Sequence, residues 1–159
     1  MGFMIGDKAV YPSHGVGVIK KIESKEVAGK NQDFYVLQII SSGLRFMVPT
    51  NNYDRVGMRS LISDIELDKI REILRTPNKI NKKNWNRRFR EFNVKLATGR
   101  LDDIAEVLRD LICLREMKEL SFGERKMMEK ARELIISEIS QLTNRVNNEV
   151  EQDLDQWLV

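Results

Sequence analysis

The hydrophobic pattern of this chain changes its period once, near residues 54–64. Before that point, short runs of β-branched and aromatic residues alternate with turn residues, which is typical of small antiparallel β structures. After it, apolar residues recur every three to four positions, which is typical of amphipathic helices. The sequence therefore predicts an α+β protein with two domains, residues 1–62 and residues 63–159.

The first domain contains four runs that are predicted to be strands. They are KAVY, VGVIKKI, DFYVLQII and LRFMV, at residues 8–11, 16–22, 33–40 and 44–48. In the last run, Leu44, Phe46 and Val48 share one face, and Arg45 and Met47 share the other. Four or five short antiparallel strands of this kind predict a small SH3-like or Tudor-like β-barrel. Because its edge strands can pair with another chain, we expect an interaction module.

The second domain is predicted to be a compact all-α bundle of about five helices. Two Ser-x-x-Glu capping boxes, Ser63 to Glu66 and Ser121 to Glu124, mark the starts of the first and fourth helices. The other helices are expected from about residue 83 to 99, from 101 to about 114, and around residues 150–158. The helix that begins at residue 101 carries the widest apolar face, so we expect it at the centre of the bundle.

The composition excludes several kinds of site. The 159 residues contain one cysteine, Cys113, and one histidine, His14, so neither an intramolecular disulfide nor a zinc site built on His and Cys is expected. No run of 18 apolar residues and no secretory signal is evident. We therefore expect a cytoplasmic protein without membrane segment, metal or cofactor, and nothing in the sequence indicates an oligomer, so a monomer is expected.

A basic segment stands out in an otherwise balanced chain, which has 27 Lys and Arg against 24 Asp and Glu. Residues 79–100 hold eight basic residues and a single acid, Glu91. Such a concentration of positive charge can bind the phosphates of a nucleic acid. The alternative is a solvated helix face with no partner, and charge alone does not separate the two.

Trp85 is the first residue of an apolar stripe on the helix that is predicted for the basic segment. Trp85, Phe89, Phe92 and Leu96 recur at helical spacing, which predicts an ordinary core stripe with Trp85 buried. However, Trp85 lies in the first turn, where its indole can project past the end of the helix. The basic residues on the opposite face and beside it are Lys82, Lys83, Arg87, Arg88 and Arg90. On this second interpretation, the cations bind phosphates and the indole stacks on an unpaired base, a contact that contributes about 1–3 kcal/mol.

Six segments of the chain resemble the CarD/CdnL family of bacterial transcription regulators. They are GDKAVYPSHGVGVI at 6–19, MVPTNN at 47–52, VGMRSLIS at 56–63, NWNRRFREF at 84–92, LATGRLDDIAEVLRDL at 96–111 and LSFGERKMMEKARELI at 120–135. The similarity is collinear over about residues 3–140, and the block NW-x-RR is its most specific part.

The resemblance implies a Tudor-like domain that docks on the β subunit of RNA polymerase and a helical domain that contacts DNA at the upstream edge of the transcription bubble. Members stabilise the open promoter complex with a tryptophan wedged into the minor groove. The DNA-binding positions implied for this chain are Lys83, Asn84, Trp85, Arg87, Arg88 and Arg90. The polymerase-binding positions implied are Lys25, Arg45, Met47, Val48 and Pro49; Lys25 and Met47 stand where some members carry arginine.

These observations predict a non-enzymatic transcription regulator that binds the polymerase β subunit and promoter DNA, with little sequence readout. The first alternative is an adaptor of the transcription machinery, in which the helical domain binds another protein and Trp85 is core. The second alternative is a hydrolase or nuclease that uses Asp102, Asp103 and Asp110. Adjacent carboxylates such as Asp102 and Asp103 face different directions on a helix, which disfavours this alternative.

Overall fold

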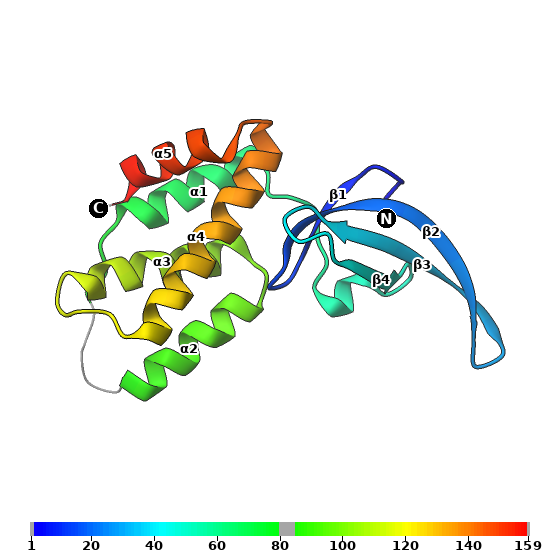
Figure 1. Ribbon diagram of the computed structural model, residues 1–159, viewed down its shortest axis with the longest axis horizontal. Helices are drawn as coiled ribbons and strands as arrows, with labels where there is room; N and C mark the ends of the chain where they lie inside the picture. Colours follow the sequence, from blue (N-terminus) through cyan, green and yellow to red (C-terminus); the bar gives the residue numbers. More distant parts are fainter. Residues whose placement is uncertain (1, 80–84, 159) are drawn as a thin grey trace. The chain divides into compact units, whose positions relative to one another are not determined.

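The computed structural model describes residues 2–79 and 85–158, and the chain divides into two compact units, residues 1–61 and 62–159 (Figure 1). The first unit contains a four-stranded antiparallel sheet, and the second contains five helices. The predicted α+β class, with strands first and helices after them, is confirmed.

The sheet has the strand order β1-β2-β3-β4. The strands are β1 (Lys8–Tyr11), β2 (Gly15–Val27), β3 (Lys30–Ile39) and β4 (Arg45–Pro49). β2 and β3 form a hairpin that extends well beyond the two outer strands (Figure 1). Its two-residue turn consists of Ala28 and Gly29, which have φ values of 53° and 80°. Positive φ at both central residues is the requirement of a type I′ turn, which matches the twist of the flanking strands.

The sheet is open, so the Tudor-like β unit predicted from the sequence is present but does not close into a barrel. Among the described residues, β1 and β4 do not pair with each other. The edge of β1 is instead met by Arg59: the N–H of Val10 donates to the carbonyl of Arg59 at 2.7 Å, and the N–H of Arg59 donates to the carbonyl of Val10 at 3.1 Å. These bonds occupy the groups on β1 that barrel closure would need.

One face of the sheet carries the core of the first unit. The buried residues of this core are Ala9, Ile19, Tyr35, Leu37, Ile39, Val48 and Met58. A short 3-10 helix, η1 (Tyr53–Val56), adds Tyr53, whose ring lies edge-on to Phe3 at 5.1 Å between centroids. The alternation of buried and exposed faces is incomplete, because Val10, Val16 and Val36 on the opposite face are buried as well.

The helices begin and end close to the predicted positions. They are α1 (Asp64–Arg75), α2 (Trp85–Ala97), α3 (Leu101–Arg115), α4 (Phe122–Thr143) and α5 (Asn147–Trp157). Ser121 and Glu124 form the complete capping box at the start of α4. At the start of α1, the hydroxyl of Ser63 accepts the N–H of Glu66, which is half of the predicted box. α3 contacts α1, α2 and α4, which confirms its central place in the bundle.

Two apolar clusters hold the helices together. The larger cluster joins α1, α3, α4 and α5, and the smaller one lies under α2. Val150 and Leu154 of α5 are buried in the larger cluster, and the guanidinium of Arg71 lies 5.0 Å from the ring of Trp157. The predicted packing role of Trp157 is therefore confirmed. Among the described helices, none is long and apolar enough to cross a membrane.

Candidate functional site

The basic helix α2 packs one side into the helical unit. Phe92 is buried, and Phe89 and Leu96 are half-buried. These side chains pack against Val107, Leu111, Leu114, Leu120, Met127 and Met128. The predicted core stripe is therefore confirmed for its three later members. Trp85 begins α2, but its side chain lies outside what the structure describes, as do Lys83 and Asn84.

The opposite side of α2 is cationic and open to solvent. Arg87 and Arg90 are exposed, one turn apart. The Nε of Arg87 forms an ion pair with Glu91 at 3.1 Å, although the side chain of Arg87 remains 74% exposed. No ion pair to Arg90 occurs within the described part of the chain. Both guanidinium groups are thus accessible to an anion outside the protein.

Arg88 differs from its two neighbours. It is half-buried, and its Nη1 is buried without a hydrogen-bond partner among the residues that the structure describes. An unpaired buried N–H of a charged group is costly, and Nη1 of Arg88 is closed to solvent, so an external anion does not reach this nitrogen as the side chain lies. Arg88 is thus positioned at the border between the packed and the open side of α2.

The first unit offers an open strand edge at β4. The N–H of Ile39 donates to the carbonyl of Leu44 at 2.8 Å, so these two residues form a hydrogen-bonded pair. Because such pairs alternate along an antiparallel ladder, the main chains of Arg45 and Met47 point away from β3. Pro49, in the same register, presents a carbonyl but has no N–H. No strand covers this edge within the described residues.

Four of the five predicted polymerase-binding residues lie on one face of the sheet. Strand alternation puts Lys25, Arg45, Met47 and Pro49 on the face opposite the core. Met47 is 39% exposed, and Lys25 and Arg45 are exposed. Val48 is the exception, because its side chain is buried in the core and its main chain faces β3.

Three cations of this face, Lys21, Lys25 and Arg45, lie close enough to Glu23 to influence its carboxyl. The hydrogen bond from Lys21 is the largest influence, and it lowers the pKa of Glu23 below its ordinary value. Partial desolvation opposes this change, while the charges of Lys25 and Arg45 add to it. The outer face of the sheet is therefore net positive around an exposed methionine.

The three aspartates of the hydrolase alternative are held by separate partners. Asp102 binds the guanidinium of Arg100 at 2.8 Å, and this hydrogen bond lowers the pKa of the Asp102 carboxyl. The other two bind elsewhere: Asp103 accepts the hydroxyl of Thr98 at 2.9 Å, and Asp110 accepts Asn78 and Arg109 at 3.1 and 3.0 Å. In residues 2–79 and 85–158, no cluster of three His, Cys, Asp or Glu residues could hold a metal ion. The structure does not bring these carboxylates together.

Comparison with known proteins matches both units to one family. Residues 3–62 match the family model of the CarD-like/TRCF RID domain, and residues 69–155 match the model of the CarD C-terminal domain. The chain belongs to the CarD/CdnL family of transcription factors. The family predicted from the sequence is therefore confirmed, and β4 and α2 lie in the first and second of its matched domains.

Relatives of this CarD/CdnL family member include a bacterial protein of similar length. "Putative transcription factor YdeB" of Bacillus subtilis (strain 168) is 34% identical over 137 residues, which cover 86% of this chain and 90% of the relative. A solved structure, "CdnLNt from Myxoccoccus xanthus", is 52% identical and covers 40% of this chain and 90% of its own, with a TM-score of 0.33.

Proposed function

We propose that this protein is a monomeric transcription regulator of the bacterial cytoplasm that docks β4 on the β subunit of RNA polymerase. Its helical unit then contacts promoter DNA at the upstream edge of the bubble and stabilises the open complex. The observation that carries the proposal is α2, a helix that starts at Trp85 and buries Phe92 while Arg87 and Arg90 stay exposed. Because the chain belongs to a family of transcription factors, DNA is the partner that we expect for this cationic helix.

The open edge of β4 supports docking by strand addition. In that mode, a partner strand binds the outward N–H and C=O groups, and side chains on alternate positions add specificity. Arg45 and Met47 supply these groups, while Pro49 ends the run of donors. The exposed cations Lys25 and Arg45 favour an acidic partner surface. Because the main chain carries the pairing, Met47 can stand where some relatives have arginine.

The cationic side of α2 supports DNA contact without sequence readout. Arg87 and Arg90 are exposed and can neutralise phosphates, while Arg88 is half-buried. In this proposal Trp85 is the wedge at the bubble edge, and Lys83 and Asn84 are further DNA contacts. Few phosphate contacts give weak binding, but tethering through β4 raises the effective DNA concentration to the order of millimolar.

The proposed mechanism is a shift in an equilibrium. Unpaired bases at the bubble edge exist only in the open complex, so a stacked indole binds that state better than the closed one. The largest possible shift equals this difference in binding free energy. A single stacking contact of about 1–3 kcal/mol would favour the open state by roughly five- to 150-fold.

The lifetime of open complexes challenged with competitor DNA tests the proposal. RNA polymerase and promoter are compared with and without the protein, at a concentration that saturates its binding to the β subunit. A longer lifetime with the protein is expected. An unchanged lifetime at saturation contradicts the proposal.

One observation favours the adaptor function instead. Val94 is 66% exposed and lies in a shallow surface groove with Arg87, Arg90, Glu91 and Lys95. An apolar residue among charges is also a feature of protein interfaces. Binding of the isolated protein to forked DNA at rising salt separates the two functions, because phosphate contacts give an affinity that falls steeply with salt. Absence of any salt-dependent DNA binding would favour the adaptor.

A further inference from the structure

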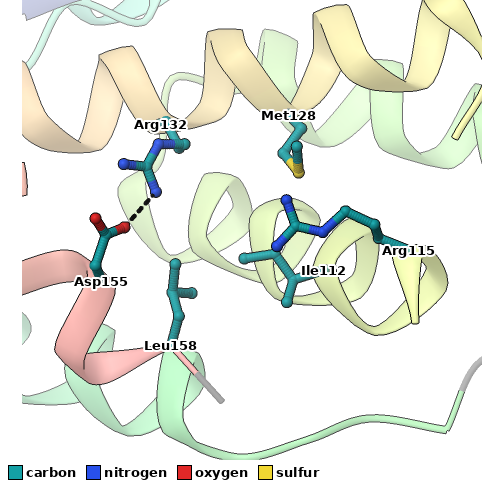
Figure 2. Close-up of a pocket in the computed structure, with 6 residues that line it drawn as sticks. All are labelled: Ile112, Arg115, Met128, Arg132, Asp155 and Leu158. Carbon is teal, nitrogen blue, oxygen red and sulfur yellow. Dashed lines mark hydrogen bonds and ion pairs between the residues drawn. The ribbon is translucent and has the colours of Figure 1, made fainter.

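A pocket of about 440 Å³ lies in the helical unit, where α3, α4 and the C-terminal end of α5 meet, and none of its lining residues is among those assigned above to DNA or polymerase (Figure 2). The residues that line it are Ile112, Arg115, Met128, Arg132, Asp155 and Leu158. Its volume is within the range of about 300–1,000 Å³ that small-molecule sites occupy. Leu158 lies beyond the part of the chain that matches the CarD C-terminal domain.

Half of the lining is apolar. Ile112 is buried, and Met128 and Leu158 are half-buried and pack against the larger helical core. Figure 2 shows that these three side chains converge on the pocket from α3, from α4 and from the residue that follows α5. Such a surface favours the apolar body of a ligand, because burying it removes apolar area from water.

Arg132 forms ion pairs with two carboxylates of α5. Its guanidinium binds Asp155 at 2.8 Å, the bond drawn in Figure 2, and Glu151 at 3.0 Å. The side chain of Arg132 is only 24% exposed. This arginine thus holds α5 against α4 and forms a wall of the pocket, with its charge balanced by its own partners.

Arg115 is the cation of the pocket that forms no ion pair with a described carboxylate. It is exposed in the last turn of α3, and no carboxylate of the described residues pairs with it. Its guanidinium points towards the middle of the lining residues (Figure 2). Of the two arginines in the lining, Arg132 is offset by Asp155 and Glu151, so Arg115 is the one whose charge no described carboxylate pairs with. A guanidinium can bind a carboxylate through two parallel hydrogen bonds.

We propose that this pocket binds a small amphipathic monoanion, with an apolar body against Ile112, Met128 and Leu158 and a carboxylate on Arg115. Met128 also packs against the cluster under α2, which includes Phe89 and Phe92. A bound ligand would therefore touch a side chain that supports the basic helix.

The probe is decanoate, titrated into the full chain and followed by NMR of ¹³C-labelled methionine methyl groups. A Met128→Leu variant identifies the Met128 signal. We expect saturable binding of one decanoate per chain, with the largest shift at Met128. Decanol, which has the same chain without the charge, is expected to bind about tenfold more weakly, because it lacks the charge-assisted hydrogen bonds.

Two matched variants test the role of Arg115. Arg115→Gln is expected to weaken decanoate binding by about tenfold. Arg75→Gln removes an exposed arginine from the last turn of α1 and is expected to leave binding unchanged. Equal affinity of decanoate and decanol for the unaltered chain would overturn the proposal without any variant. Absence of a Met128 shift, or equal losses in the two variants, would also overturn it.

Discussion

The N–H of Ile62 donates a hydrogen bond of 2.9 Å to the carboxylate of Glu138. Ile62 is the first residue of the helical unit, and Glu138 lies 76 positions later, in the C-terminal half of α4. Glu138 is only 2% exposed, so the bond is shielded from water. This contact fixes the start of the helical unit to its longest helix.

Replacing Glu138 with alanine is expected to destabilise the helical unit. The buried N–H of Ile62 would lose its acceptor, which lowers the free energy of unfolding by about 1–3 kcal/mol. Glu138→Gln keeps an oxygen at the same place and is expected to cost less. Urea denaturation at neutral pH measures both variants. Equal stability of Glu138→Ala and the unaltered chain would show that this bond contributes nothing.

The capping box of α4 predicts a specific loss of stability in acid. Burial raises the pKa of the Glu124 carboxyl, but hydrogen bonds from Ser121 and Lys118 outweigh it and hold the pKa below its ordinary 4.5. A folded-state pKa below the unfolded one means that the carboxylate stabilises the fold above 4.5 and loses this contribution as the pH falls further. Glu124→Gln is therefore expected to flatten the pH dependence of unfolding below 4.5. Unchanged curvature in this variant would contradict the assignment.

Glu91 is expected to weaken DNA binding in the natural sequence. It is the one acid on the basic segment and pairs with Arg87 at 3.1 Å. Glu91→Gln releases Arg87 for one more phosphate contact, so a plot of log affinity against log salt should steepen by about 0.9. Both side chains are exposed, so stability should change by no more than about 0.5 kcal/mol.

Asp68→Asn is the matched control for this prediction. Asp68 forms a similar exposed pair with Arg71 at 2.9 Å, but on α1. Its replacement changes the net charge by the same amount and should leave the salt slope unaltered. If both variants steepen the slope equally, the effect comes from net charge rather than from Arg87.

Met47→Pro is expected to abolish polymerase binding while the β unit stays folded. The N–H of Met47 points to the open edge, so its removal breaks no bond to β3. A partner strand would lose its central donor, and we expect affinity for the β subunit to fall at least tenfold. Met47→Ala removes the side chain and keeps the N–H, so it should bind within a few-fold of the unaltered chain. Biolayer interferometry with the β subunit measures both; equal binding by Met47→Pro would exclude β4 as the pairing edge.

Much of the fold follows from local patterns in the sequence. Ser63 and Ser121 mark helix starts because a capping side chain acts within four residues. Pro77 marks a helix end because proline disfavours the helical conformation at the residue before it, Thr76, which is extended. The distal half of the β2–β3 hairpin could not be predicted in this way. Its residues, from Glu23 to Asp33, are mostly polar, and the pairing depends on cross-strand partners and on the Ala28-Gly29 turn.

The site residues likewise fall into two groups: those whose position follows from a local sequence pattern, and those whose position depends on long-range packing. The exposed positions of Arg87 and Arg90 follow from the apolar stripe on the other side of α2. The half-burial of Arg88 depends on how α2 packs on its neighbours, which no spacing rule contains. The open sheet depends on Arg59 pairing with Val10 of β1, which lies 49 positions earlier in the sequence. The resemblance implies a polymerase contact at Val48, but its side chain lies on the core face.

The lifetime of competitor-challenged open complexes with Trp85→Ala tests the central claim most directly. The proposed wedge predicts that this variant binds the β subunit normally, unfolds within about 1 kcal/mol of the unaltered chain and no longer extends the lifetime. Trp157→Phe, at the other tryptophan, should extend the lifetime as the unaltered chain does. Full extension by Trp85→Ala would contradict the wedge. A loss of about 3–5 kcal/mol in stability would instead assign Trp85 to the core.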